Sequence, residues 1–123
     1  MILDAGALIA LDRNERSMWV RLKALEAAGE LPVTHGGVVG QAWRGGARQA
    51  RLARALAGTD VRPLDQRLGR AAGELLGAAR MSDVVDAALV LLAADGDVIV
   101  TIDSDDIETL ATAAGRHVEL IRP

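Results

Sequence analysis

The chain of 123 residues contains no cysteine, which excludes disulfide bonds and thiolate-bound metal ions. It also contains no phenylalanine or tyrosine, and Trp19 and Trp43 are its only aromatic residues. Proteins that hold single-stranded nucleic acid on stacking platforms need more aromatic side chains, so the composition argues against such a surface. Lysine occurs once, at Lys23, and the remaining strong bases are arginines, which suit forked contacts with phosphate or carboxylate groups.

Long apolar runs are absent as well. None approaches the roughly 20 residues that cross a bilayer, and residues 1–13 lack the basic leader of a signal peptide. We therefore expect no membrane contact, and the missing cysteines fit a cytoplasmic protein. The net charge of -3 argues against wholesale coating of nucleic acid. Because half of the residues are apolar, the length predicts a single domain, residues 1–123, with its own core.

Short apolar strands alternate with helical patterns along the whole chain. We predict strands at 2–3, 31–34, 60–64, 98–101 and 118–121, and helices at 5–11, 15–28, 38–44, 47–57, 65–79, 104–114 and in the apolar stretch that Ser82 caps. This alternation is typical of a parallel sheet covered on both faces. The predicted fold is therefore an α/β, three-layer α/β/α sandwich whose central, mostly parallel sheet has about five strands.

Asp86 is a single charged residue inside the apolar helix that follows Ser82. It lies between Val85 and Ala87, and we place it past the first helical turn, where the helix dipole no longer favours an acid. Burying a charge is costly unless the charge is paired or bound to a metal ion. Stability alone does not explain such a residue, so Asp86 is a strong candidate for a functional role.

Two other acids follow predicted strands. Asp4 comes directly after the strand at 2–3, and Asp103 comes soon after the strand at 98–101. Each could simply cap the helix after it, but ligands of parallel sheets bind beyond the carboxyl ends of the strands. Carboxylates that meet there raise each other's pKa unless a cation neutralises them. Oxygen donors favour Mg²⁺ or Mn²⁺, so Asp4, Asp86 and Asp103 form a candidate metal site.

Further candidates lie near these acids or carry positive charge. Asp106 is an auxiliary ligand candidate, although the helix dipole alone also favours an acid at its position. Thr101 could hydrogen-bond a ligand or a phosphate. His35 and His117 have no partner at zinc-site spacing, and we interpret both as surface or strand-end residues. Four arginines, spaced to share one broad helical face, are either solvated or contact RNA or a partner: Arg44, Arg48, Arg51 and Arg54.

Four segments of the chain carry these acids and their neighbours: ILDAGALIAL, VVGQAWRGG, SDVVDAALVLLAA and VIVTIDSDDIETLA. In their order and spacing they resemble PIN-domain ribonucleases, and more narrowly the VapC toxins of VapBC toxin–antitoxin pairs. The resemblance covers essentially the whole chain and implies a parallel sheet between helices. It also implies RNA cleavage with Mg²⁺ or Mn²⁺, inhibition by a cognate VapB-type antitoxin, and a homodimer or toxin–antitoxin hetero-oligomer. Asp4, Asp86 and Asp103 match the acids of the family's metal site.

The resemblance also exposes a departure at Gln41. The family usually carries glutamate at this position, and no other acid lies between Glu30 and Asp60. Glutamine can offer a carbonyl oxygen to a metal ion or its water, but it brings no charge. Two unit charges about 4 Å apart interact by roughly 4 kcal/mol at an effective dielectric constant of about 20. We therefore expect weaker metal binding and reduced or lost cleavage.

Three functions compete on this basis. The leading hypothesis is a metal-dependent endoribonuclease, the toxin of a type II toxin–antitoxin system, which hydrolyses RNA phosphodiester bonds with activity attenuated by Gln41. The alternative, which Gln41 favours, is a catalytically impaired PIN module that binds an antitoxin or RNA. A phosphoryl-transfer domain of the receiver or haloacid-dehalogenase sort also groups acids at strand ends. Such domains use a lysine late in the chain, whereas the only lysine here is Lys23, so this third hypothesis ranks lowest.

Overall fold

Five parallel strands form the central sheet of the protein, whose computed structural model describes residues 1–123. They are β1 (Ile2–Leu3), β2 (Val33–His35), β3 (Asp60–Arg62), β4 (Val98–Val100) and β5 (Glu119–Ile121). The strand order is β3-β2-β1-β4-β5, and Ile2 of β1 pairs with Val33 on one side and with Ile99 on the other. The sheet is parallel throughout, which confirms the predicted α/β class.

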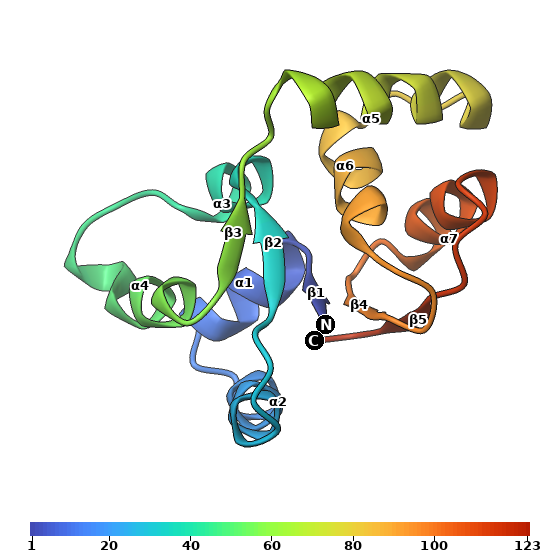
Figure 1. The fold of residues 1–123 in the computed structure, drawn as a ribbon. Coiled ribbons are helices and arrows are strands. Elements are labelled where there is room, and N and C mark those ends of the chain that lie inside the picture. The colour runs from blue at the N-terminus through green and yellow to red at the C-terminus, as the bar shows by residue number, and fades with distance from the viewer.

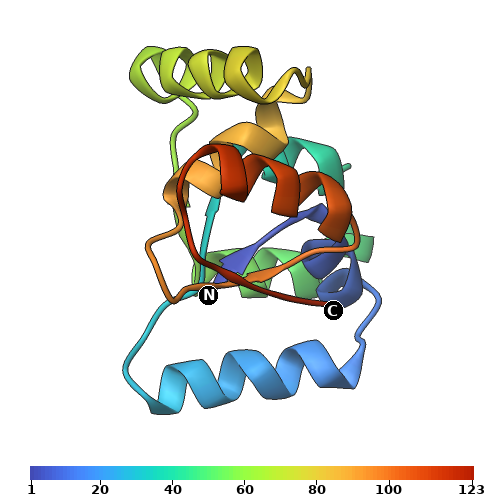
Figure 2. The same cartoon turned by 90° about the vertical axis from the view of Figure 1, so that its right-hand side faces the viewer.

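Seven helices cover this sheet (Figure 1). They are α1 (Ala5–Asp12), α2 (Arg16–Ala27), α3 (Gly36–Ala42), α4 (Ala50–Ala57), α5 (Gln66–Ala79), α6 (Val84–Leu92) and α7 (Ser104–Ala113). Helix α1 packs against α2, α3 and α4, whereas α5, α6 and α7 pack against one another. The two groups form the outer layers of the predicted three-layer sandwich, and in Figure 2 the helices α5 and α2 lie at its two extremes. None of the helices combines the length and the apolar content that crossing a bilayer requires.

The strand order reverses at β1, and this reversal creates a crevice. From β1 the chain proceeds outward to β2 and β3, then returns across the sheet to β4 and β5 on the other side. Consequently α1, which follows β1, and α7, which follows β4, belong to opposite layers although their strands are neighbours. The carboxyl ends of two such strands open between the layers, where open α/β sheets bind their ligands.

The core lies on both faces of the central strands. Ile2, Leu3, Ile99 and Val100 are all buried, although successive residues of a strand point to opposite faces. Both faces of β1 and β4 are therefore covered, as the apolar runs in the sequence predicted. At the edge strand β3, by contrast, Val61 is exposed, and Pro63, which follows the strand, suits an edge position.

The predicted helix at 47–57 differs from the observed one. A short 3-10 turn, η1 (Ala47–Gln49), precedes α4, and α3 ends at Ala42. Gly45 and Gly46 both have a φ of 88°, a conformation that no regular helix contains, so the chain between the two helices is a loop. Every other strand and helix with a predicted range lies within two residues of that range at each end.

Candidate functional site

Asp4 occupies the crevice at the carboxyl end of β1. It is the N-cap of α1, and its Oδ1 accepts a hydrogen bond of 2.8 Å from the backbone N–H of Ala5. Its Oδ2 accepts a second hydrogen bond of 2.7 Å from the hydroxyl of Thr101, which follows β4. Asp4 is almost completely buried, so these two contacts fix its carboxylate at the junction of the neighbouring strands.

Thr101 connects Asp4 to the third predicted acid. Its hydroxyl donates to Asp4 and accepts a hydrogen bond of 3.0 Å from the backbone N–H of Asp103. Because Thr101 is buried and its hydroxyl is engaged on both sides, it positions the two acids in this structure rather than reaching outward to a ligand. Asp103 stands at the N-cap position of α7, yet its side chain makes no capping hydrogen bond. Its exposed carboxylate therefore has no structural partner.

The local position of Asp86 differs from the prediction. Helix α6 begins at Val84, and the N-cap is Asp83 rather than Ser82, because the Asp83 carboxylate accepts a hydrogen bond of 3.1 Å from the N–H of Asp86. Asp86 therefore lies in the first helical turn, where the helix dipole does favour an acid. The prediction that Asp86 lies past the first turn was therefore wrong, because the helix begins one residue later than predicted.

Burial and neighbouring charges nevertheless make Asp86 an unusual acid. Its residue is 5% exposed, and its carboxylate accepts no hydrogen bond from the protein. The pKa of Asp86 is raised from 3.8 to about 7, mainly by burial and in addition by the charges of four surrounding acids. These acids are Asp4, Asp83, Asp103 and Asp106. The structure thus brings the three predicted acids and the auxiliary candidate Asp106 around one point.

Gln41 belongs to α3, which begins at the carboxyl end of β2 and packs against α1. The residue is exposed, and its amide makes no hydrogen bond with the protein. Asp106 is likewise exposed, in the first turn of α7. Both side chains are thus free to interact with a bound group, although neither is held in place by a protein partner.

The donor set fits a hard divalent cation by its chemistry. A buried carboxylate without a hydrogen-bond donor, surrounded by further carboxylates, is stabilised in its charged form by a cation, and oxygen ligands match Mg²⁺ or Mn²⁺. As the side chains stand, however, no group of three or more acidic or histidine side chains is arranged to hold a metal ion. Asp4 is fixed by its two hydrogen bonds, so closing the ligand set requires the unpartnered side chains of Asp86 and Asp103 to move.

His35 stands at a strand end, as predicted, but the sequence did not predict its burial. It ends β2 but is completely buried rather than at the surface. Its Nδ1 accepts a hydrogen bond of 3.0 Å from Gly37, so Nε2 carries the proton and donates at 2.9 Å to the carbonyl of Val85. A Cβ at position 37 would lie only 2.9 Å from the ring of His35, so the buried ring leaves no room for a larger residue there. The His-Gly-Gly sequence at the strand end was therefore the one signal of this burial. His35 thereby ties the end of β2 to the residue before Asp86.

The four arginines do not share one helical face. Arg44 lies outside α4, and its guanidinium donates to the carbonyls of Gly40 and Trp43 at the end of α3. Arg48 lies in η1, and only Arg51 and Arg54 belong to α4 itself. All four are exposed, including Arg44, so they remain available to an anionic partner as a broad surface rather than a stripe.

Buried Gln49 shapes the loop that separates Arg44 from the helix. Its Oε1 accepts hydrogen bonds of 2.7 and 2.8 Å from the N–H groups of Arg44 and Gly45. Its Nε2 donates to the carbonyl of Ala42 at 2.9 Å. One side chain thus satisfies three backbone groups that the end of α3 leaves without partners.

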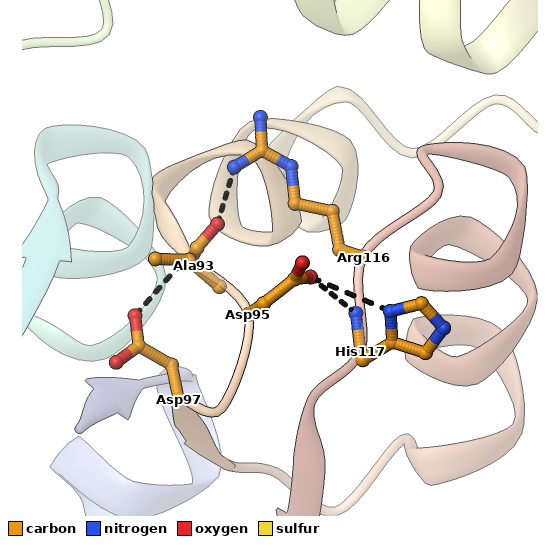
Figure 3. Close-up of polar contacts among 6 residues, drawn as sticks. Ala93, Asp95, Asp97, Arg116 and His117 are labelled. Carbon is orange, nitrogen blue, oxygen red and sulfur yellow. Dashed lines mark hydrogen bonds and ion pairs between the residues drawn. The ribbon is translucent and has the colours of Figure 1, made fainter.

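A second group of acids lies at the opposite end of the sheet, in the loop before β4, where it contacts the loop before β5 (Figure 3). Asp95 accepts a hydrogen bond of 2.8 Å from the N–H of His117, and Asp97 accepts one of 2.8 Å from the N–H of Ala94. The guanidinium of Arg116 donates to the carbonyl of Ala93 and links the two loops. Both acids have protein partners, which distinguishes them from Asp86 and Asp103 of the crevice.

No protein-family model matches this chain, and no curated protein matches it either. The functional inference therefore depends on the residues of the crevice and on the chemistry that they can perform.

Proposed function

We propose that the protein is an Mg²⁺- or Mn²⁺-dependent endoribonuclease of the PIN type, the toxin of a type II toxin–antitoxin pair, with activity attenuated by Gln41. The observation that carries the proposal is Asp86, a buried carboxylate without a hydrogen-bond donor among four other carboxylates at the strand-order reversal. Such an arrangement destabilises the protein unless a cation compensates it. If these carboxylates bind a divalent cation, their presence in the crevice is explained.

Asp4, Asp86 and Asp103 would hold the cation through carboxylate oxygens. When bound, the cation supplies an activated water and stabilises the charge of the leaving oxygen in phosphodiester hydrolysis. The hydroxyl of Thr101 keeps one oxygen of Asp4 in a fixed orientation, and its contact with the N–H of Asp103 sets the path of the following loop. His35 holds the start of α6, and with it Asp86, against the end of β2.

The proposal extends to RNA and to an antitoxin. Exposed Arg48, Arg51 and Arg54 supply positive charge that can follow an RNA backbone, at the usual cost of sensitivity to salt. A cavity of about 420 Å³ lies between α2 and α4 next to Arg54, and there exposed Leu31 and half-buried Trp19 contribute apolar surface. Helix α2 buries only Met18 completely, so this surface suits a peptide segment of an antitoxin. A homodimer is proposed from the resemblance alone.

The decisive experiment compares RNA cleavage by the parent chain and by Gln41→Glu, each with Mg²⁺ or Mn²⁺. Restoring a fourth acidic charge should strengthen metal binding, so Gln41→Glu should cleave at least about 10-fold faster than the parent. Adding Asp86→Asn to Gln41→Glu should abolish the gain. Cleavage that is equal in all three proteins would point to a contaminating nuclease and contradict the proposal.

The second candidate is an impaired PIN module that binds an antitoxin or RNA without cleaving it. It is favoured by the exposed, uncharged Gln41 and by the absence of a closed metal-holding group. If neither the parent nor Gln41→Glu cleaves RNA, while both form a stable complex with the product of a neighbouring antitoxin reading frame, this candidate replaces the nuclease.

A further inference from the structure

We propose that a pocket beside the acidic crevice binds one nucleotide of a single-stranded RNA, with Ile102 beneath the base and with Arg13 and Arg122 at the phosphates. The pocket has a volume of about 400 Å³, within the usual size of a small-ligand site. Its lining also includes Gly6, Ile9 and Ala10 of α1. The proposal rests on the proposed function, because it names a subsite next to the same acids.

Two residues of the pocket lining are close in sequence to the acids of the crevice. Gly6 lies two residues after Asp4, and Ile102 lies between Thr101 and Asp103. A Cβ at Gly6 would lie only 2.9 Å from Cγ2 of Ile102, so the side chain of Ile102 rests on the space that glycine leaves open. A nucleotide in this pocket would therefore be the direct neighbour of a phosphate held at the acids.

Ile102 provides an apolar surface where one is otherwise unexpected. It is 58% exposed although it is flanked by a buried threonine and an acid, and no element covers it. Apolar side chains that face a cleft of this kind pack against the face of an unpaired base, and such contacts do not depend on an aromatic platform. The protein has no phenylalanine or tyrosine that could serve instead.

The two arginines supply the charge that a phosphate needs. The only ion pairs of the structure join Arg62 to Asp60 and His117 to Asp95, so neither guanidinium of the pocket is neutralised by an acid. Arg13 ends α1, and Arg122 follows β5, so the two approach the pocket from different elements. Glu15 also contributes to the lining but pairs with neither of them. Two unpaired arginines are complementary to the phosphates of an RNA strand, whereas the neighbouring carboxylates need a cation to accept one.

The test measures binding of a fluorescein-labelled, eight-nucleotide single-stranded RNA by fluorescence anisotropy, in EDTA and over a series of salt concentrations. Losing two phosphate contacts should reduce the slope of log K against log salt by about 1.4, since each contact on a single strand contributes about 0.7. The double variant Arg13→Ala/Arg122→Ala should therefore show that smaller slope and about 10-fold weaker binding at low salt. The control Arg67→Ala/Arg70→Ala removes the same charge from exposed positions of α5 and should bind like the parent.

The apolar contact has its own variants. Ile102→Ser should weaken binding about 3-fold without changing the salt slope, because it removes a contact with a base rather than with a phosphate. Gly6→Ala should have a similar effect, since the added methyl would lie 2.9 Å from Cγ2 of Ile102 and must shift the Ile102 side chain.

The inference is overturned if the parent binds no RNA at low salt, if all variants bind like the parent, or if the α5 control loses as much affinity as the pocket variant. Failure of the proposed function is a separate outcome: Gln41→Glu then cleaves nothing, whereas the ranking of the binding variants is unaffected. Conversely, cleavage by Gln41→Glu together with unchanged binding in every pocket variant would leave the nuclease and remove the subsite.

Discussion

The two ends of the sheet hold aspartates in opposite electrostatic settings. At the carboxyl end, burial and four neighbouring acids raise the pKa of Asp86 to about 7. At the amino end, the hydrogen bond from the backbone N–H of His117 lowers the pKa of Asp95, and the charges of His117 and Arg116 act in the same direction. Asp95 has the partners that stabilise a carboxylate, whereas Asp86 has none. The difference separates acids that shape a loop from acids that are available to a ligand.

Asp97 illustrates the structural kind. Its carboxylate accepts from the N–H of Ala94 across a turn in which Gly96 has a φ of 88°. Each acid in these loops satisfies a backbone group that would otherwise lack a partner. In the crevice, only Asp4 and Asp83 act in this way, through contacts with α1 and α6. The dipoles of α6 and α7 favour Asp86 and Asp106 in their first turns, but no donor of the protein neutralises either carboxylate.

The largest expected effect comes from exchanging one acid at each end. In the Gln41→Glu background, Asp86→Asn should lower the rate of RNA cleavage with Mn²⁺ by at least about 100-fold, because it removes a metal ligand. Asp95→Asn is the matched control and should leave the rate unchanged. Single-turnover cleavage of a labelled RNA measures both. Equal losses in the two variants would erase the distinction drawn between the two ends.

Stability should respond to pH with the sign set by Asp86. Its pKa is about 7 in the folded chain and near the ordinary 3.8 in the unfolded chain, so the folded state binds more protons between these values. The free energy of unfolding of the metal-free parent should therefore fall as pH rises from about 4 to 7. At pH 8, Asp86→Asn should be more stable than the parent by about 2 kcal/mol, roughly half of the converted pKa shift, because water still screens this carboxyl.

Urea unfolding in EDTA at pH 4 and pH 8 measures this effect. The difference between Asp86→Asn and the parent should be large only at pH 8 and should shrink when Mg²⁺ is added, because the cation stabilises the parent. If the difference in free energy of unfolding between the parent and the variant is the same at pH 4 and pH 8, Asp86 is an ordinary surface acid.

Thr101→Val should produce a smaller loss, about 10-fold in the apparent affinity for Mn²⁺, because Asp4 and the N–H of Asp103 both lose a hydrogen-bond partner. Thr34→Val is the control, since the buried hydroxyl of Thr34 donates to the carbonyl of Leu3 and touches no acid. Both variants should lose stability, but only Thr101→Val should weaken metal binding, followed as the metal-induced rise in Tm. A loss of metal affinity in both would assign Thr101 a merely structural role.

The smallest effect is expected at the amino end. Asp95 and His117 are both largely exposed, with ring and carboxylate 3.6 Å apart, so their ion pair is screened by water. Asp95→Asn should shift Tm by at most about 2 °C at pH 7. The contribution of Asp95 should be present at neutral pH and should disappear as pH falls below its ordinary pKa, because its folded pKa is lowered. Thermal melts at pH 3 and pH 7 test this. A larger change in Tm for Asp95→Asn than for Asp86→Asn would contradict the difference between the two ends of the sheet.

Much of the fold followed from local patterns. The alternation of short strands and helices predicted the parallel sheet, and the apolar runs of β1 and β4 predicted that both of their faces are covered. The acids after these strands could be assigned to one edge because parallel strands share the direction of their carboxyl ends. The start of α6 was missed by one residue, since Ser82 and Asp83 are both good caps and only the structure shows which one bonds the helix.

Other features could not be predicted because they join segments far apart in the sequence. The burial of His35 depends on the carbonyl of Val85, fifty residues away, and the pairing of Thr101 with Asp4 spans 97 residues. No local pattern specifies such partners. The loop around Gln49 also escaped prediction, because an arginine spacing compatible with one helix was interrupted by two glycines with positive φ.

The sequence by itself thus determined which residues carry charge in apolar surroundings and at which strand ends they stand, because hydrophobic periodicity and strand order along the chain are local properties. The tertiary structure decided which of these charges have partners. Whether Asp86 or Asp95 is stabilised depends on donors and charges brought from other elements, and those are placed only when the two layers of helices close on the sheet.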